Sequence, residues 1–311
     1  MVEPAGAWDS AYHAPVLVGD ILAALAAAPV VLDGTLGGGG HSAALLAEGH
    51  RVYAVDRDPD AVAAAGERLA EEAGTGRFRA FVANFAALDA VPELRAVRFD
   101  GILLDLGVSS HQLDDLARGF SFRPGAPLDM RMGGGEDAAG LLAEAQEAEL
   151  AAVFREYGDE PRAARVAREI VRRRARRPFV TSDDLVAAIR GALGPRSGPG
   201  DFARLFQAVR IAVNDELRGL DAALPDLRER LSPGGRLAIV AYHSGEDRIV
   251  KRAFRDWSLA CRCPPRQPLC SCGGRALGTL VTRRPVVPDG AEVARNPRAR
   301  SAKLRVWQRA A

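Results

Sequence analysis

Short hydrophobic runs alternate with segments of helical periodicity over the first third of the chain. Each run ends at a polar residue or a turn, which is typical of buried parallel strands. We expect strands over Val30–Asp33, Arg51–Asp56, Phe78–Val82 and Phe99–Asp105, with helices over 42–48 and 59–73. Strands that alternate with helices predict βαβ units and a parallel sheet covered on both faces.

The strand pattern breaks after Gly107. Residues 113–135 are rich in Gly and Pro and are expected to form a loop, and 138–218 has mostly helical periodicity. Strands return at Gly235–Tyr242, Thr279–Arg283 and Ala302–Gln308, with a loop over 284–300. The pattern therefore predicts one α/β domain interrupted by a helical insertion between its fourth and fifth strands.

Composition excludes several classes of protein. Of 311 residues, 48% are hydrophobic and 26% charged, which is ordinary for a globular chain and unlike disordered or fibrous ones. The longest apolar stretch, Ile21–Leu32, is too short for a bilayer, which needs ~20 residues. The first residues lack the pattern of a signal peptide. We expect a cytoplasmic protein that does not enter a membrane.

The net charge is only +2, so any binding of nucleic acid must come from local patches. Residues 161–178 hold eight arginines and one acid, Glu169, on an amphipathic helical pattern. This segment is predicted to contact RNA phosphates, and Arg295–Arg300 is a second candidate. The alternative is a solvated face, because 40 of the 42 basic residues are arginine, as in a GC-rich genome.

A glycine-rich turn, residues 33–41, follows the first strand, and Asp56 ends the second. Glycine lets the backbone approach a ligand, and an acid at Asp56 can accept the ribose hydroxyls of an adenosine. An acid ahead of the glycines, Asp33, suits the ammonium of S-adenosylmethionine better than the pyrophosphate of NAD. A tight turn without a ligand is the alternative.

An ordered series of motifs resembles the bacterial small-subunit rRNA cytosine-N4 methyltransferases of the MraW type. The matching segments are His13–Leu17, Asp33–Ser42, Asp56–Pro59, Asp105–Asp114, Arg118–Arg123, Pro127–Met132, Phe206–Leu217, His243–Arg248 and Asn296–Ser301. His111 and Gly245 stand where the family usually has Pro and Leu, and many relatives lack the cysteines at 261–272.

The resemblance implies an S-adenosylmethionine-dependent methyltransferase acting on the exocyclic N4 of a cytidine in the decoding region of 16S rRNA, within the small ribosomal subunit. It also implies a class I, Rossmann-like α/β methyltransferase domain, residues 1–112 and 216–311, with an inserted helical substrate-recognition domain, 113–215. A homo-oligomer is left open. By similarity, the cofactor contacts fall on Gly39, Gly40, His41, Asp56, Phe85, Asp105 and Gln112.

Two residues are candidates for catalysis. Cytosine N4 is a poor nucleophile that must be positioned and must lose a proton, and Asp105 and His243 end the fourth and fifth strands. Asp105 can instead serve the cofactor, and His243 can merely cap a strand end. Methylation at C5 would need a cysteine nucleophile, and no cysteine lies near these strands. Phe120 and Phe122 are predicted either to stack a base or to anchor their loop.

Four cysteines, Cys261, Cys263, Cys270 and Cys272, form a cluster that fits either a structural zinc site or reduced thiols. We assign no metal to the protein and no cysteine to catalysis. Two other functions compete with a methyltransferase. They are a nicotinamide-dependent oxidoreductase and a non-catalytic RNA-binding assembly factor.

Overall fold

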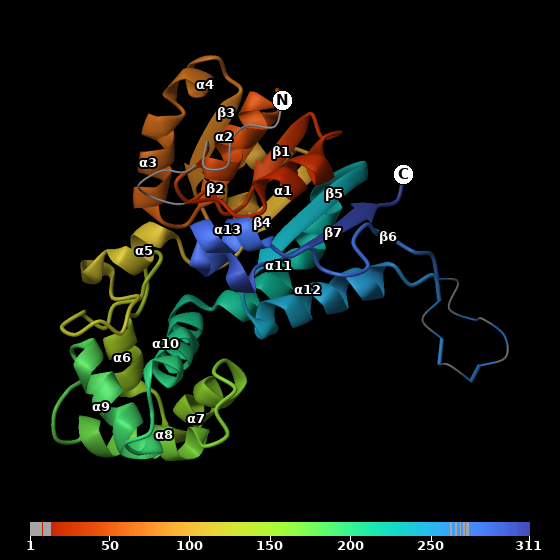
Figure 1. Cartoon of the computed structure of the whole chain (residues 1–311). Helices are drawn as coiled ribbons and strands as arrows, with labels where there is room; N and C mark the ends of the chain where they lie inside the picture. The colour runs from red at the N-terminus through yellow and green to blue at the C-terminus, as the bar shows by residue number, and fades with distance from the viewer. Residues whose placement is uncertain are drawn as a thin grey trace. The chain divides into compact units, whose positions relative to one another are not determined.

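The computed structural model describes Trp8 and residues 14–261, 263–264, 266–267, 269, 271 and 274–311. The chain divides into two compact units. Unit 1 comprises Met1–Gly107 and Leu217–Ala311, and unit 2 comprises Val108–Glu216. Figure 1 shows a sheet flanked by helices in unit 1 and helices with connecting loops in unit 2.

Unit 1 is built on a seven-stranded sheet of order β3-β2-β1-β4-β5-β7-β6. Its strands are β1 (Val30–Asp33), β2 (Arg51–Asp56), β3 (Phe78–Val82), β4 (Phe99–Asp105), β5 (Leu231–Ala241), β6 (Gly278–Leu280) and β7 (Lys303–Arg309). The first five strands run parallel, and β7 lies antiparallel between β5 and β6. This sheet confirms the predicted α/β class.

Successive residues of each strand point to opposite sides of the sheet. Both faces are apolar, and helices cover both of them. Val31 belongs to one apolar cluster with Ile21 of α1, and Leu32 belongs to the other with Phe254 of α12. The first cluster includes residues of α1 (Val18–Leu25), α2 (Gly40–Ala47) and α3 (Pro59–Arg68). The second includes residues of η1 (Phe85–Ala90), η2 (Pro92–Leu94), α11 (Glu216–Arg230) and α12 (Ser244–Trp257).

Several sequence predictions in unit 1 were wrong in detail. β5 begins at Leu231 rather than Gly235, and β6 ends at Leu280 rather than Arg283. The helix expected over 59–73 is divided into α3 and α4 (Ala70–Gly74) at Leu69, whose buried side chain joins the core. The loop expected over 284–300 contains α13 (Gly290–Arg295) and η4 (Pro297–Ser301). Asp289 begins α13 by accepting a hydrogen bond from the Glu292 N–H at 2.7 Å, a capping signal that the prolines of this segment obscured.

Unit 2 packs its helices around a core of its own. They are α5 (Ser110–Asp114), η3 (Leu116–Arg118), α6 (Ala138–Glu144), α7 (Glu147–Glu156), α8 (Ala163–Arg174), α9 (Ser182–Leu193) and α10 (Pro199–Asn214). The core includes Phe154, Ile170, Leu185 and Leu205. Phe122 packs edge-on against Phe202 and Phe206, with ring centroids 6.1 Å away in both cases. This packing favours the anchoring role for Phe122 over base stacking.

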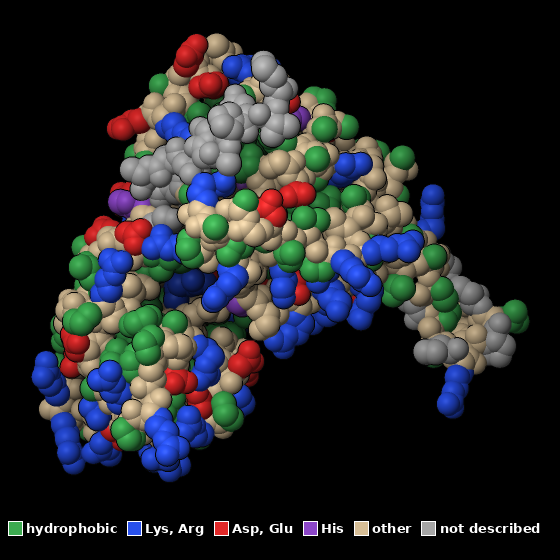
Figure 2. All heavy atoms as spheres, viewed as in Figure 1, with side chains coloured by type: hydrophobic (Ala, Val, Ile, Leu, Met, Phe, Trp, Pro, Cys, Tyr) green, Lys and Arg blue, Asp and Glu red, His purple; other side chains and the backbone are tan. Residues whose placement is uncertain are grey.

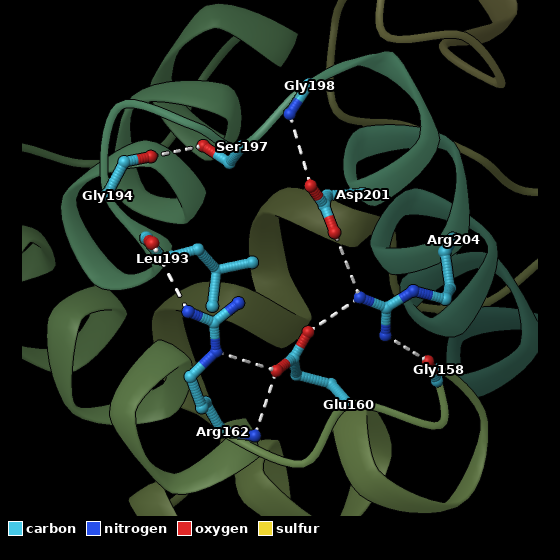
Figure 3. A network of polar contacts seen from close by, with 9 residues as sticks. All are labelled: Gly158, Glu160, Arg162, Leu193, Gly194, Ser197, Gly198, Asp201 and Arg204. Carbon is cyan, nitrogen blue, oxygen red and sulfur yellow. Dashed lines mark hydrogen bonds and ion pairs between the residues drawn. The ribbon is translucent and has the colours of Figure 1, made fainter.

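A buried carboxylate joins three segments of unit 2 (Figure 3). Glu160 is 1% exposed and accepts hydrogen bonds from Arg204 at 2.6 Å and from the Arg162 N–H at 2.8 Å. Arg204 also reaches Asp201, and Arg162 reaches the Leu193 carbonyl. Burial opposes ionisation of Glu160, but these donors outweigh it and hold the pKa of this carboxyl below its usual value. These ion pairs thus hold the loop that precedes α8 against α10.

No helix among the described residues is both long enough and apolar enough to cross a membrane.

Candidate active site

The candidate site lies at the carboxyl-terminal ends of the parallel strands of unit 1, here called the carboxyl edge. Asp33, Asp56 and Asp105 are the last residues of β1, β2 and β4, and His243 follows β5 by two residues. In open α/β sheets this edge is where ligands bind. The topology therefore brings together side chains that are far apart in the sequence.

The turn after β1 is held close to the sheet. The Gly34 N–H donates to the Leu103 carbonyl at 2.9 Å, and a Cβ at Gly34 would collide with Leu104 and come within 3.2 Å of Phe85. Gly39 has φ of +74°, which L side chains rarely adopt. Gly40 and His41 then begin α2. The glycines are thus required by packing and by backbone conformation, and they bring the chain close to Phe85.

Asp33 stabilises this turn from inside the protein. It is 1% exposed, and its carboxylate accepts hydrogen bonds from Ser42 Oγ at 2.7 Å and the Thr35 N–H at 3.2 Å. Burial raises the pKa of Asp33, although His41 and Ser42 act in the opposite direction. These contacts give Asp33 a structural role. The expectation that it faces a ligand ammonium finds no support in them.

Asp56 is partly exposed at the end of β2. Its Oδ2 accepts from the Gly37 N–H and its Oδ1 from the Asp58 N–H, both at 2.9 Å. Burial raises the pKa of Asp56 to about 6, against the effect of these two donors. A carboxylate has about four acceptor positions, so it can accept further hydroxyl donors while keeping both backbone bonds.

Asp105 is held between two side chains. Tyr242 donates its hydroxyl to Asp105 Oδ1 at 2.9 Å, and His41 Nδ1 lies 3.6 Å from Asp105 Oδ2. The His41 Nε2 atom donates to the Val16 carbonyl at 2.9 Å, which leaves Nδ1 as the nitrogen that faces the carboxylate. Burial and the nearby Asp105 charge hold the pKa of Tyr242 well above its usual value, so the phenol stays protonated as a donor.

His243 is the N-cap of α12. Its Nδ1 accepts from the Gly245 N–H at 3.2 Å, so in the neutral ring the proton is on Nε2. Nε2 lies 3.3 Å from Oε1 of the buried Glu246 without hydrogen-bond geometry. Among the described residues, it is a buried nitrogen that has no hydrogen-bond partner. His243 thus combines a capping role with a buried N–H that faces the Glu246 carboxylate.

The structure therefore gathers Gly39, Gly40, His41, Asp56, Phe85, Asp105 and His243 in unit 1. Gln112 belongs to unit 2, where its side chain accepts from the Ser109 N–H at 3.0 Å in a reciprocal cap of α5. Its assignment to the cofactor stays a prediction.

Sequence reasoning missed Tyr242 and Glu246. Tyr242 binds Asp105, and Glu246 Oε2 accepts from the Tyr242 N–H at 2.8 Å and the His243 N–H at 3.2 Å. The spacing of an N-cap residue and a Glu three positions later is a helix-start signal that could have identified Glu246. Nothing in the sequence shows that the Tyr242 side chain reaches across to β4.

The arginines of α8 differ in their surroundings. Arg172 and Arg173 both bind Glu169, at 2.6 Å and 2.7 Å, and Arg172 above all lowers the pKa of that carboxyl to about 2. Arg165 and Arg176 are exposed, and no ion pair among the described residues involves either. The α8 surface, residues 161–178, is therefore neutralised at Arg162, Arg168, Arg172, Arg173 and Arg177, and it keeps the charges of Arg165 and Arg176 available.

The cysteine cluster falls partly outside the described residues. Cys261 and Cys263 lie in the described part of the chain, where the Cys263 N–H donates to Cys261 Sγ at 3.4 Å. Cys270 and Cys272 lie outside the described residues. The zinc site and the reduced thiols both stay predictions.

The order of the sheet, with an antiparallel β7 beside β5, and the glycine turn after β1 define a class I, Rossmann-like methyltransferase. The model of the MraW methylase family matches residues 10–310. A ribosomal RNA small subunit methyltransferase H from Gemmatimonas aurantiaca is 64% identical over 301 residues, covering 96% of each chain. One from Heliobacterium modesticaldum is 47% identical over 310 residues, covering 96% of this chain and 98% of that one. The chain belongs to the MraW methylase family, which confirms the resemblance drawn from its motifs.

Proposed function

We propose that this protein transfers the methyl group of S-adenosylmethionine to the exocyclic N4 of a cytidine in the decoding region of 16S rRNA, in the cytoplasm. Methylation of ribosomal RNA follows from the family and from relatives named as small-subunit rRNA methyltransferases. One structural observation carries the choice of an amino group. A hydrogen-bond acceptor, Asp105, and an N–H without a hydrogen-bond partner among the described residues, His243 Nε2–H, stand at the carboxyl ends of the adjacent strands β4 and β5.

The residues of the carboxyl edge fit S-adenosylmethionine. Asp56 can accept the ribose hydroxyls, and the tightly packed turn at Gly34 and Gly39 lets the backbone approach the ligand. Phe85 provides an apolar surface beside that turn. The bound cofactor supplies an electrophilic methyl group on a sulfonium. We assign its binding to unit 1, and recognition of the RNA substrate to unit 2.

The pair Asp105 and His243 complements the edge of cytosine that carries its amino group. N4–H is a donor and N3 an acceptor, so Asp105 accepts from N4–H while His243 Nε2–H donates to N3. As the N4–C bond forms and the methyl–sulfur bond breaks to leave neutral S-adenosylhomocysteine, the amine becomes acidic and its proton passes to an Asp105 oxygen. Because His243 Nδ1 is occupied by the Gly245 N–H, the ring acts by orienting the base. Adenine N6 and N1 present the same pattern, and the family resemblance favours cytosine.

The affinity for S-adenosylmethionine should depend on the ionisation of Asp56. Asp56→Ala is expected to weaken binding by about 1.5–3 kcal/mol, the scale of charge-assisted hydrogen bonds. Because the pKa of Asp56 is about 6 and the ionised form accepts the hydroxyls, wild-type affinity should fall about tenfold from pH 7.5 to pH 5. Calorimetry at both pH values measures this change. An equal pH dependence in Asp56→Asn would assign the titration to another group.

The ends of the α8 surface should contact RNA. Arg165→Gln with Arg176→Gln is expected to weaken binding of single-stranded RNA and to lower the salt slope by about 1.4, from two phosphate contacts at ~0.7 each. The control is Arg172→Gln with Arg173→Gln, which removes equal charge from side chains already bound to Glu169. A slope unchanged from wild type in the first double variant would show that this surface is only solvated.

The proposed activity is tested by transfer from methyl-labelled S-adenosylmethionine to small ribosomal subunits. Label in 16S rRNA is the expected result. Binding of subunits without transfer would favour an RNA-binding assembly factor, and preferential binding of NAD would favour an oxidoreductase.

A further inference from the structure

The outer face of α12 carries a second cationic surface, in addition to the α8 segment. Arg248, Lys251, Arg252 and Arg255 are all exposed and follow one another at helical spacing. The opposite face of the helix buries Val250, Phe254 and Trp257 against the sheet. The four cations therefore form one stripe, here called the α12 stripe. Figure 2 shows Lys and Arg side chains gathered over this part of unit 1.

Acidic neighbours neutralise only part of the α12 stripe. Arg252 binds Asp221 of α11 at 2.7 Å, and Arg255 binds the adjacent Asp256 at 3.1 Å. The acids at the start of α12 are engaged elsewhere, since Asp247 binds Arg305 at 2.7 Å. None of the ion pairs among the described residues involves Arg248 or Lys251. The end of the stripe nearer to β5 thus keeps two charges available to a partner.

The position of α12 ties this charge to the site. The helix begins at Ser244, directly after His243 at the carboxyl edge. With a rise of 1.5 Å per residue, Arg248 lies about 6 Å along the helix from its start and Arg255 about 10 Å further. Both the stripe and the carboxyl edge belong to unit 1. The stripe therefore runs away from the site on the same compact body.

We propose that the α12 stripe binds the phosphate backbone of the RNA strand next to the methylated nucleotide. The inference rests on the proposed function and adds to it a surface for the substrate in unit 1. Guanidinium and ammonium groups bind phosphate oxygens without reading the base, which fixes the strand in position. A stripe of about 10 Å is long enough to meet more than one phosphate of a single strand.

The test compares two double variants that remove equal charge from unit 1. Arg248→Gln with Lys251→Gln acts on the stripe. Arg51→Gln with Arg79→Gln acts on exposed side chains near the amino ends of β2 and β3, away from the carboxyl edge. Binding of a cytidine-containing single-stranded RNA oligonucleotide is measured from low to high salt. The stripe variant should bind about tenfold more weakly at low salt, with a salt slope lower by about 1.4, and the control should match wild type.

Two further measurements keep the outcomes distinct. Calorimetry should show wild-type affinity for S-adenosylmethionine in both variants, which establishes that unit 1 is folded. Lys251 is one of two lysines in the chain, so its acylation in unaltered protein can be followed by mass spectrometry and should slow when RNA is bound. Wild-type RNA affinity in the stripe variant, or unchanged acylation of Lys251, would overturn the inference. Absence of methyl transfer by the wild type would instead overturn the proposed function.

Discussion

Replacing Asp105 with Asn should lower the single-turnover rate of methyl transfer by ~10²–10⁴, the range for loss of one positioned acid–base group. Asn keeps the shape of the side chain but cannot take the amine proton. Asp105→Ala should weaken cofactor binding as well, because His41 and Tyr242 would lose the carboxylate that they face. Single-turnover transfer to small subunits and cofactor calorimetry separate the two effects.

Tyr242→Phe is the matched control for Asp105. It removes the hydroxyl that donates to Asp105 Oδ1 and leaves the carboxylate in place, so it should cost the rate far less than Asp105→Asn. Equal losses in the two variants would mean that the hydrogen bond, rather than proton transfer to Asp105, is what matters. Full activity in Asp105→Asn would remove Asp105 from the reaction.

The two roles of His243 should separate when it is replaced by Ala and by Asn. Both variants lose the Nε2–H donor that orients the base, so both should reduce the transfer rate by ~10² with cofactor affinity near wild type. Asn is a good N-cap, so His243→Asn should also keep most of the stability of α12, whereas His243→Ala should lose about 1 kcal/mol. Thermal unfolding and single-turnover transfer measure the two properties on the same samples.

Two other outcomes would assign His243 a different role. Wild-type rate in His243→Asn, with a lower rate in His243→Ala, would leave the histidine as a cap alone. Loss of cofactor binding in both variants would place it in the cofactor site. In either case the orientation of the base would depend on other residues.

Much of the fold could be predicted because the parallel strands β1, β2 and β4 are short, mostly apolar runs bounded by turns. β1 to β4 begin and end at the predicted residues. The break at Leu69 could not be predicted, because Leu69 continues the apolar pattern of α3 and leaves the helix only to join the core. The prolines after residue 284 suggested a loop, but Asp289 and Asn296 cap short helices there.

The site residues that lie at strand ends could be predicted from the sequence. Asp56, Asp105 and His243 are polar residues at or just after strand ends, and the parallel topology brings such residues to one edge. Sequence could not show that Asp33 would turn inward to Ser42, or that Tyr242 would reach Asp105. Both depend on where a side chain points in the folded chain, which spacing along the sequence does not encode.

The proposed reaction places the methyl group on N4 of a cytidine. The most direct measurement is mass spectrometry of nucleosides from 16S rRNA after small subunits have reacted with the purified protein and S-adenosylmethionine. We expect N4-methylcytidine, identified against a standard and formed ~10²–10⁴ more slowly when the Asp105→Asn variant is used. A methyl group on cytidine C5, on adenosine N6 or on a ribose would contradict it.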